Sequence, residues 1–243
     1  MFDLVIFDLD GTLVDTAPEL GDAVNDTLES LGLAPVPEAL VRDWIGYGTR
    51  ELMARACAHV VGSPVDLLRR SGTIESAMRL FSRHYAARCG TRARPYPGVE
   101  ATLQGLRGFS VRTALVTNKE RQYASSLLHS LDLLRYFDPL VAGDTLPEKK
   151  PHPLPLQFCL RAHAIRPERA LFVGDSSIDV ETARNAGVLV WLVPYGYNRG
   201  RPIAASHPDR VIATVTEVLD AVRTEHGVGR DVAASRRCGP MLP

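Results

Sequence analysis

Two aspartates, two positions apart, follow an apolar run near the start of the chain. The run is Leu4–Phe7, and the turn after it contains Asp8, Asp10 and Gly11. A short apolar run that ends in a polar turn is typical of a buried strand in a parallel sheet. One of two carboxylates so placed can attack an electrophilic centre. The other can protonate the departing group and later deprotonate a water.

Three more groups of polar residues lie in loops after later apolar runs. They are Thr117 and Asn118, Lys149 and Lys150, and Asp175 with Asp179. Because the strand-to-helix loops of a parallel sheet all lie at one edge, we expect these side chains to converge with the first pair of aspartates. The expected cluster combines several carboxylates with a hydroxyl and an ammonium group.

Carboxylates gathered in this way repel one another, and a divalent cation relieves that repulsion. Mg²⁺ prefers one or two carboxylates together with water and phosphate oxygens. Lysine and threonine can donate hydrogen bonds to a phosphoryl group, and their charge and dipoles stabilise its transfer. The cluster therefore predicts Mg²⁺-assisted transfer of a phosphoryl group.

Each group also has an ordinary structural interpretation. Aspartate favours turns and helix starts, so Asp8 and Asp10 could form a turn, and Asp179 could cap a helix. Capping by Asp179 would not exclude a role in the site. We interpret Asp15 and Thr16 as a cap for the following helix and leave them out of the chemistry. The recurrence of polar groups in four successive loops favours the functional interpretation.

Short apolar runs alternate with amphipathic segments along most of the chain. The expected strands are Leu4–Phe7, Thr113–Val116, Leu140–Ala142, Ala170–Val173 and Val188–Val193. The expected helices between the later strands are Tyr123–Leu131, Leu154–His163 and Ile178–Asn185. This alternation predicts an α/β fold with a Rossmann-like, doubly wound parallel sheet that helices cover on both faces. We expect residues 1–15 and 95–225 to form this core.

The interval between the first two expected strands is long and lacks a strand-like run. It contains helical stretches at Ala17–Leu31, Pro37–Ile45, Thr49–Val61 and Pro64–Cys89. Since this interval is too long for an ordinary loop, we expect residues 16–94 to form an α-helical cap subdomain. The cap would lie over the carboxyl ends of the strands, where ligands bind in open α/β sheets.

The composition is that of a globular protein, with 243 residues, 45% of them hydrophobic. The 28 basic and 28 acidic side chains give no net charge, which argues against a nucleic-acid partner. No apolar run approaches the roughly 18 residues of a membrane span, and the first residues lack a signal-peptide pattern. We therefore expect a cytoplasmic protein that does not bind membranes. We expect the Gly-containing tail, residues 226–243, to be disordered.

Four segments resemble, in order and spacing, the signature motifs of the haloacid dehalogenase-like (HAD) hydrolases. They are Asp8–Thr16, Val116–Lys119, Lys150–Pro153 and Gly174–Asp179. The resemblance extends from the first strand to about residue 222. It implies a HAD-like core with a cap inserted after the first strand, Mg²⁺ as the cofactor, and hydrolysis of a small phosphate monoester through an aspartyl-phosphate.

The resemblance also implies a role for each carboxylate. Asp8 would be the nucleophile and a ligand of Mg²⁺. Asp10 would be the general acid and base, and its backbone carbonyl would bind the metal. Asp175 would be the second metal carboxylate, and Asp179 would orient a metal-bound water or Lys150.

Three further residues would hold the phosphoryl group in this resemblance. Thr117 and the amide of Asn118 would bind its oxygens, and Lys150 would neutralise the charge it shares with the nucleophile. Lys150 is preferred over Lys149 because it directly precedes Pro151.

Several segments, among them Trp44–Gly48, resemble the phosphoglycolate phosphatase branch of this family. That branch hydrolyses 2-phosphoglycolate to glycolate and phosphate. The cap residues that would contact the substrate are Trp44, Gly46, Tyr47, Gly48 and Arg50. The structural alternative is a glycine turn between helices, with Trp44 in the core and Arg50 solvated.

Other activities remain open on the sequence alone. A phosphatase for another small metabolite, such as a sugar phosphate, would keep every catalytic residue. A phosphosugar mutase would also have Asp8 and Asp10 but would need its bisphosphate intermediate to reorient. A dehalogenase is disfavoured, because displacement of a halide needs neither an acid nor a metal. A binding module with a dead site would lack the nucleophile. The protein could be a monomer or a homodimer.

Overall fold

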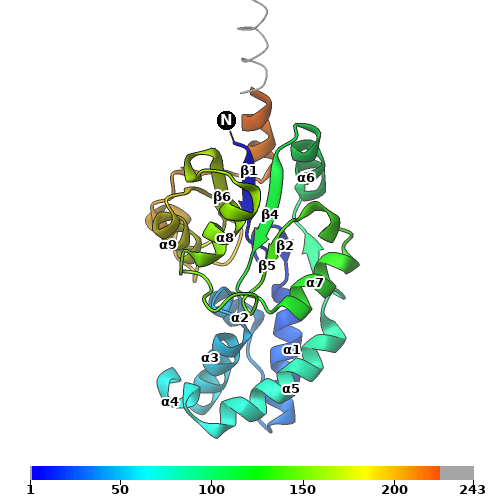
Figure 1. Ribbon diagram of the computed structural model, residues 1–243. Coiled ribbons are helices and arrows are strands. Elements are labelled where there is room, and N and C mark those ends of the chain that lie inside the picture. Colours follow the sequence, from blue (N-terminus) through cyan, green and yellow to red (C-terminus); the bar gives the residue numbers. More distant parts are fainter. Residues whose placement is uncertain (1, 225–243) are drawn as a thin grey trace, which may run out of the picture.

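The computed structural model describes residues 2–224, and its centre is a sheet of six parallel strands (Figure 1). In spatial order the strands are β5 (Leu140–Val141), β4 (Arg112–Val116), β1 (Leu4–Phe7), β6 (Ala170–Gly174), β7 (Leu189–Leu192) and β8 (Arg210–Val211). Strand β1 lies between β4 and β6, and Phe7 is paired with Leu115 on one side and Val173 on the other. The polar turns after these three strands therefore meet at one edge.

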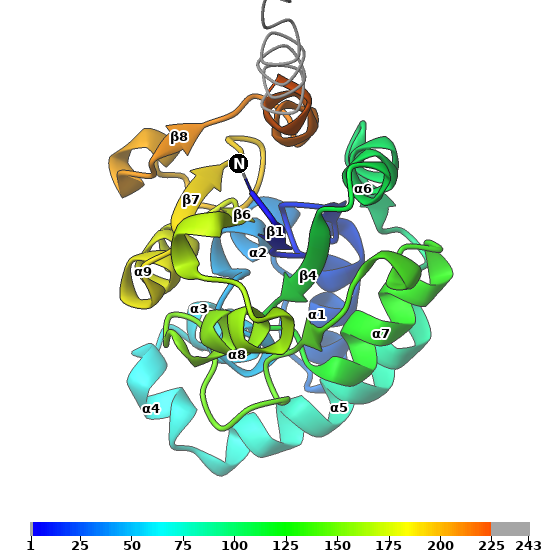
Figure 2. The ribbon, with the colours of Figure 1, turned by 45° about the horizontal axis from the view of Figure 1, so that its top comes forward.

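Helices cover both faces of this sheet (Figure 2). One face carries α6 (Val99–Gly108), α7 (Arg121–Ser130) and a last helix that begins at Thr216, and the other carries α8 (Leu154–His163) and α9 (Ser177–Ala186). Side chains alternate along β1, so Val5 and Phe7 pack on the first face and Leu4 and Ile6 on the second. The predicted doubly wound α/β sheet is confirmed. Three short 3₁₀ helices complete the core: η1 (Leu134–Tyr136), η2 (Pro167–Arg169) and η3 (Ile203–Ser206).

The five helices between β2 and β3 form a separate layer beyond the carboxyl ends of the strands, drawn blue to cyan in Figure 1. They are α1 (Ala17–Ser30), α2 (Glu38–Trp44), α3 (Thr49–Val61), α4 (Val65–Arg69) and α5 (Gly72–Arg88). This cap has its own hydrophobic core, in which Met53 and Phe81 are fully buried. Tyr123 and Tyr197 from the sheet domain also pack into that core.

A short antiparallel ribbon connects the two parts. It pairs β2 (Val14–Asp15) with β3 (Arg94–Pro95), where the chain leaves the sheet domain and returns to it. The sequence did not predict this ribbon or β8, because strands of two residues leave no hydrophobic periodicity. The single helical stretch expected over 64–89 is two helices, since Ser71 has an extended backbone that separates α4 from α5.

No helix among residues 2–224 is long and apolar enough to cross a membrane. The tail at 226–243, for which disorder is predicted, lies outside the described residues.

Candidate active site

The carboxylates of Asp8, Asp175 and Asp179 meet at the carboxyl edge of the sheet. Each offers an oxygen within 4.8 Å of the other two, and all three residues are buried. The loop after β1 can pass this close to Asp175 because residue 11 is glycine. Gly11 has φ +85°, and a Cβ there would lie 2.0 Å from Asp175 Oδ2.

Lys150 connects two of these carboxylates. Its Nζ lies 2.7 Å from Asp8 Oδ1 and 2.7 Å from Asp179 Oδ1, and its side chain is buried. The neighbouring Lys149 is exposed and donates a hydrogen bond to the carbonyl oxygen of Tyr47 at 2.9 Å. Lys150 is thus the lysine of the carboxylate cluster, as the sequence predicts.

Asp179 has both carboxylate oxygens in use. Oδ1 accepts from Lys150, and Oδ2 accepts from the backbone N–H groups of Asp175 at 3.2 Å and Ser176 at 3.1 Å. Asp179 also forms a capping box with Ser176 at the start of α9. It therefore both caps the helix and positions Lys150, and the two interpretations of this residue are compatible.

Burial and mutual repulsion shift the pKa values in the cluster. Burial raises the pKa of Asp8 to about 7, with Asp179 adding to the shift and Lys150 opposing it. Burial and the charge of Asp179 also raise the pKa of Asp175 well above its usual range. For Lys150, burial disfavours the charge, but Asp179 and Asp8 outweigh it and raise the pKa. A hard cation fits this cluster, because the ligand atoms that the cluster offers are all carboxylate oxygens. The positive charge of the cation would offset the repulsion between the carboxylates.

Asp10 lies on the cap side of this cluster. Its Oδ1 accepts hydrogen bonds from Lys119 Nζ at 2.9 Å and from Thr16 Oγ1 at 2.7 Å. Thr16 does precede α1, but its hydroxyl makes no capping hydrogen bond and instead contacts Asp10. The cap interpretation of Thr16 is therefore corrected: the residue holds the second aspartate.

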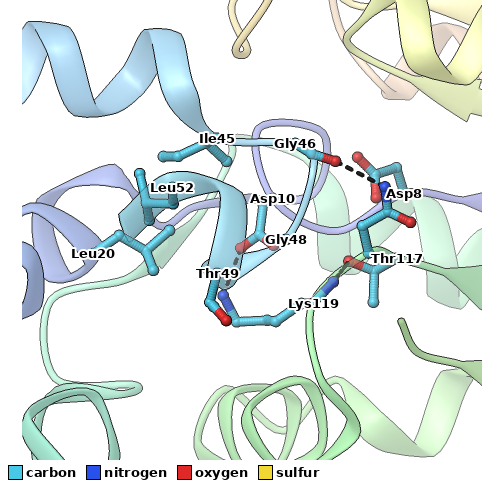
Figure 3. Close-up of a pocket in the computed structure, with 11 residues that line it drawn as sticks. Asp8, Asp10, Leu20, Ile45, Gly46, Gly48, Thr49, Leu52, Thr117 and Lys119 are labelled. Carbon is cyan, nitrogen blue, oxygen red and sulfur yellow. Dashed lines mark hydrogen bonds and ion pairs between the residues drawn. The ribbon is translucent and has the colours of Figure 1, made fainter. Parts of the chain in front are cut away.

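Thr117 and Asn118 follow β4 and line the same cavity as Asp8 and Asp10 (Figure 3). The Asn118 side-chain amide donates to the carbonyl oxygen of Gly46 at 2.9 Å and to that of Lys150 at 3.0 Å. It thereby connects the cap loop to the loop that carries Lys150. That Thr117 and the Asn118 amide bind a phosphoryl group remains a prediction.

The cap closes over these residues and leaves a cavity of about 30 Å³. Leu20, Ile45 and Leu52 form its apolar wall, and Figure 3 shows them grouped opposite Asp8. Thr49 also lines the cavity, and its hydroxyl donates to Glu120 of the sheet domain. Sequence reasoning missed this wall, because apolar cap residues that face a ligand look the same as core residues.

The five predicted cap residues divide into two groups. Gly46 and Gly48 line the cavity. Trp44 instead packs against His59, with ring centroids 5.6 Å apart, and the ring of Tyr47 lies 4.2 Å from the Arg199 guanidinium.

Arg50 also lies away from the cavity and forms an ion pair with Glu75 at 2.6 Å. Residues three apart share a helix face, so Thr49 and Leu52 occupy the face of α3 that lines the cavity, and Arg50 lies on another face. Arg50 is therefore directed away from the cavity in this structure, and a contact between Arg50 and the substrate stays a prediction.

Tyr197 lies in the loop after β7 and contacts the carboxylate cluster, a position that the sequence analysis did not predict. Its backbone N–H donates to Asp175 Oδ2 at 2.5 Å, and its hydroxyl donates to Asp15 Oδ1 at 2.6 Å. The same hydroxyl accepts from the backbone N–H groups of Thr16 at 2.9 Å and Ala17 at 3.0 Å. Tyr197 therefore connects the carboxylate cluster to the ribbon and to the start of the cap.

The fold and these residues match known proteins. The family profile of the haloacid dehalogenase-like hydrolases matches residues 5–193. The chain belongs to this family. As a HAD hydrolase it is 44% identical over 216 residues to phosphoglycolate phosphatase 1 of Pseudomonas aeruginosa, covering 89% of this chain and 78% of that protein. It is 41% identical over 221 residues to the phosphoglycolate phosphatase of Nitrosospira multiformis, covering 90% and 95%.

A solved structure has the same fold as this chain. The crystal structure of a predicted phosphoglycolate phosphatase from Haemophilus somnus 129pt superposes with a TM-score of 0.85 at 33% identity, covering 90% of this chain and 97% of that one. The family, the fold and the hydrolase class of this chain are therefore settled together.

Proposed function

We propose that this HAD hydrolase is a Mg²⁺-dependent phosphatase that releases phosphate from a small monoester, namely 2-phosphoglycolate. The supporting observation is the placement of Asp8 and Asp10 in one cavity beneath the cap, with Lys150 paired to Asp8 and Lys119 paired to Asp10. A nucleophile and a proton donor on the same loop, with separate cations, are what a two-step displacement at phosphorus requires.

In the first step, an oxygen of Asp8 attacks phosphorus and the bond from phosphorus to the ester oxygen breaks. Asp10 donates a proton to that oxygen, so glycolate leaves as the alcohol. Lys150 holds Asp8 in position at 2.7 Å and offsets the charge that builds on the phosphoryl oxygens.

In the second step, water attacks phosphorus of the aspartyl-phosphate. Asp10 accepts the proton from this water, and the bond between phosphorus and Asp8 breaks to restore the free carboxylate. Because Asp8 is only 6% exposed beneath the cap, bulk water has little access to the reacting centre.

The metal would be held by the carboxylates of Asp8 and Asp175 and by the backbone carbonyl of Asp10. When bound, Mg²⁺ supplies positive charge to the phosphoryl oxygens. Asp179 would act through Lys150, because both of its oxygens are already engaged.

The substrate is proposed from the relatives and from the cavity together. Two relatives named as phosphoglycolate phosphatases share 44% and 41% identity with this chain. The small cavity with an apolar wall of Leu20, Ile45 and Leu52 suits a short leaving group and leaves the hydroxyl groups of a sugar without partners. A sugar phosphate, or the bisphosphate of a mutase, is therefore the weaker alternative. We place the enzyme in the cytoplasm, with no nucleic-acid or membrane partner.

Phosphate release from a panel of small phosphate esters, with Mg²⁺ and with a chelator, tests this function. We expect 2-phosphoglycolate to give the highest kcat/KM and the chelator to abolish turnover. A sugar phosphate as the best substrate, or full activity with the chelator, would contradict the proposal.

A further inference from the structure

The cavity contains one cation whose task the catalytic steps leave open. Among the described residues that line it, Lys119 is the only one with a cationic side chain. It is 3% exposed, and its ammonium lies 4.9 Å from the ring centroid of Tyr85 in the cap. A buried ammonium is costly unless it has a partner, and here Asp10 provides one at 2.9 Å (Figure 3).

The position of Lys119 separates its role from that of Lys150. Lys150 contacts Asp8, the group that attacks phosphorus, from behind the cavity lining, so it acts at the phosphoryl end of the site. Lys119 contacts Asp10, the group that protonates the ester oxygen, so it belongs to the leaving-group end. An anionic group one carbon beyond the ester oxygen would come within reach of Lys119.

The other nearby cations cannot take this place in the closed cap. Arg50 lies on another face of α3 and pairs with Glu75. Lys149 is exposed and bonds a cap carbonyl outside the cavity. The side chains of the apolar wall have no donor for a carboxylate, and the hydroxyl of Thr49 beside them already donates to Glu120.

We propose that Lys119 binds the carboxylate of the leaving group and makes the enzyme selective for short phosphorylated hydroxy acids. This inference rests on the proposed phosphatase function and goes beyond it by assigning the specificity to one side chain of the sheet domain. On binding, the substrate carboxylate joins or replaces Asp10 as the partner of Lys119, so the ammonium stays paired throughout.

The test compares two esters of equal chain length, 2-phosphoglycolate and ethyl phosphate, in the Lys119→Met variant. Loss of a charged hydrogen bond should lower kcat/KM for 2-phosphoglycolate on the order of 100-fold more than for ethyl phosphate. The ratio of the two values is the diagnostic, because any effect of the variant on Asp10 lowers both. An unchanged ratio would overturn the proposal.

Two further variants complete the design. Lys119→Gln keeps a donor to Asp10 without the charge, and it should shift the ratio in the same direction even if the methionine variant folds poorly. Arg79→Met removes an exposed cap cation on α5 outside the cavity and should leave the ratio within about 3-fold of wild type.

The wild-type enzyme separates the two proposals. If it fails to hydrolyse 2-phosphoglycolate, the proposed function is wrong. If it hydrolyses this ester but the Lys119 variants keep the wild-type ratio, only the specificity assignment is wrong.

Discussion

The sheet domain and the cap contribute side chains of different chemistry to the active site. The sheet domain contributes a chain of buried ion pairs in which Lys150 joins Asp8 to Asp179, and each group is fixed by a partner. The cap contributes apolar side chains such as Leu52 and the glycines around residue 47. The difference implies that the sheet domain carries the chemistry and that the cap encloses the substrate.

The contacts across the boundary differ from place to place. Tyr123 and Tyr197 of the sheet domain pack into the hydrophobic core of the cap, whereas the contacts beside the cavity are polar. Asn118 and Lys149 each donate to a carbonyl oxygen of the loop between α2 and α3, and Thr49 donates to Glu120. Hydrogen bonds of this kind exchange with water at a small net cost, on the order of 1 kcal/mol each. The boundary can therefore open for substrate entry while the carboxylate cluster stays assembled.

Asp8→Asn should give the largest effect of any substitution. The amide cannot attack phosphorus, so we expect phosphate release to fall by a factor of about 10⁴ or more. The melting temperature should not fall, because the variant removes one of the crowded carboxylates. Asp3→Asn, on the surface beside Arg169, is the matched control and should keep full activity. Undiminished turnover in Asp8→Asn would exclude covalent catalysis.

Asp10→Asn should give the next largest effect. Loss of the proton donor should lower kcat for 2-phosphoglycolate by roughly 10²–10⁴-fold. An ester with a good leaving group, such as para-nitrophenyl phosphate, needs less protonation of that group. For this ester, the substitution should therefore lower the rate of aspartyl-phosphate formation by a smaller factor. Single-turnover measurements with both esters check this, and equal losses in that step would contradict the assignment of Asp10 as the acid.

Gly48→Ala tests the cap side of the comparison. Gly48 has φ +94°, and a Cβ there would lie 3.1 Å from Lys149 Nζ and 3.2 Å from the Asn118 carbonyl oxygen. We expect the strained loop to raise KM about 10-fold with little change in kcat, since about 1–2 kcal/mol of strain would act on closure. Gly62→Ala, also at positive φ but in open space, controls for backbone strain alone. A fall in kcat comparable to that of Asp10→Asn would contradict the conclusion that the sheet domain carries the chemistry and the cap only encloses the substrate.

The smallest expected effect is on stability as a function of pH. In the metal-free protein the pKa of Asp8 is about 7, above its ordinary value of 3.8, so the folded state binds more protons than the unfolded state between these values. This group therefore costs stability as pH rises from about 4 to 7. Asp8→Asn should raise the melting temperature relative to wild type more at pH 7.5 than at pH 5. Thermal unfolding in a chelator checks the sign, and a gain confined to pH 5 would contradict it.

The sequence predicted the sheet side of the site better than the cap side. The strands β4, β1 and β6 are neighbours in the sheet, and each is followed by one of the predicted residues Thr117, Asp8 and Asp175. Parallel pairing of these strands alone brings the three residues to one edge. The direction of Arg50 depends instead on how α3 packs, which no local pattern records. Thr16 was misinterpreted for the same reason, since its hydroxyl finds Asp10 only after the loop has folded.

The small number of lysines in this chain makes chemical labelling of their amines a simple measure of how the cap moves. The sequence has only three, Lys119, Lys149 and Lys150, among 28 basic residues. In the closed form Lys149 is exposed, whereas the other two side chains are 2% and 3% exposed. An amine-directed acylating reagent would therefore label Lys149 before the two buried lysines. Lys119 becomes accessible only as the two halves separate, so its labelling rate, read by peptide mass, would report directly on how often the enzyme opens.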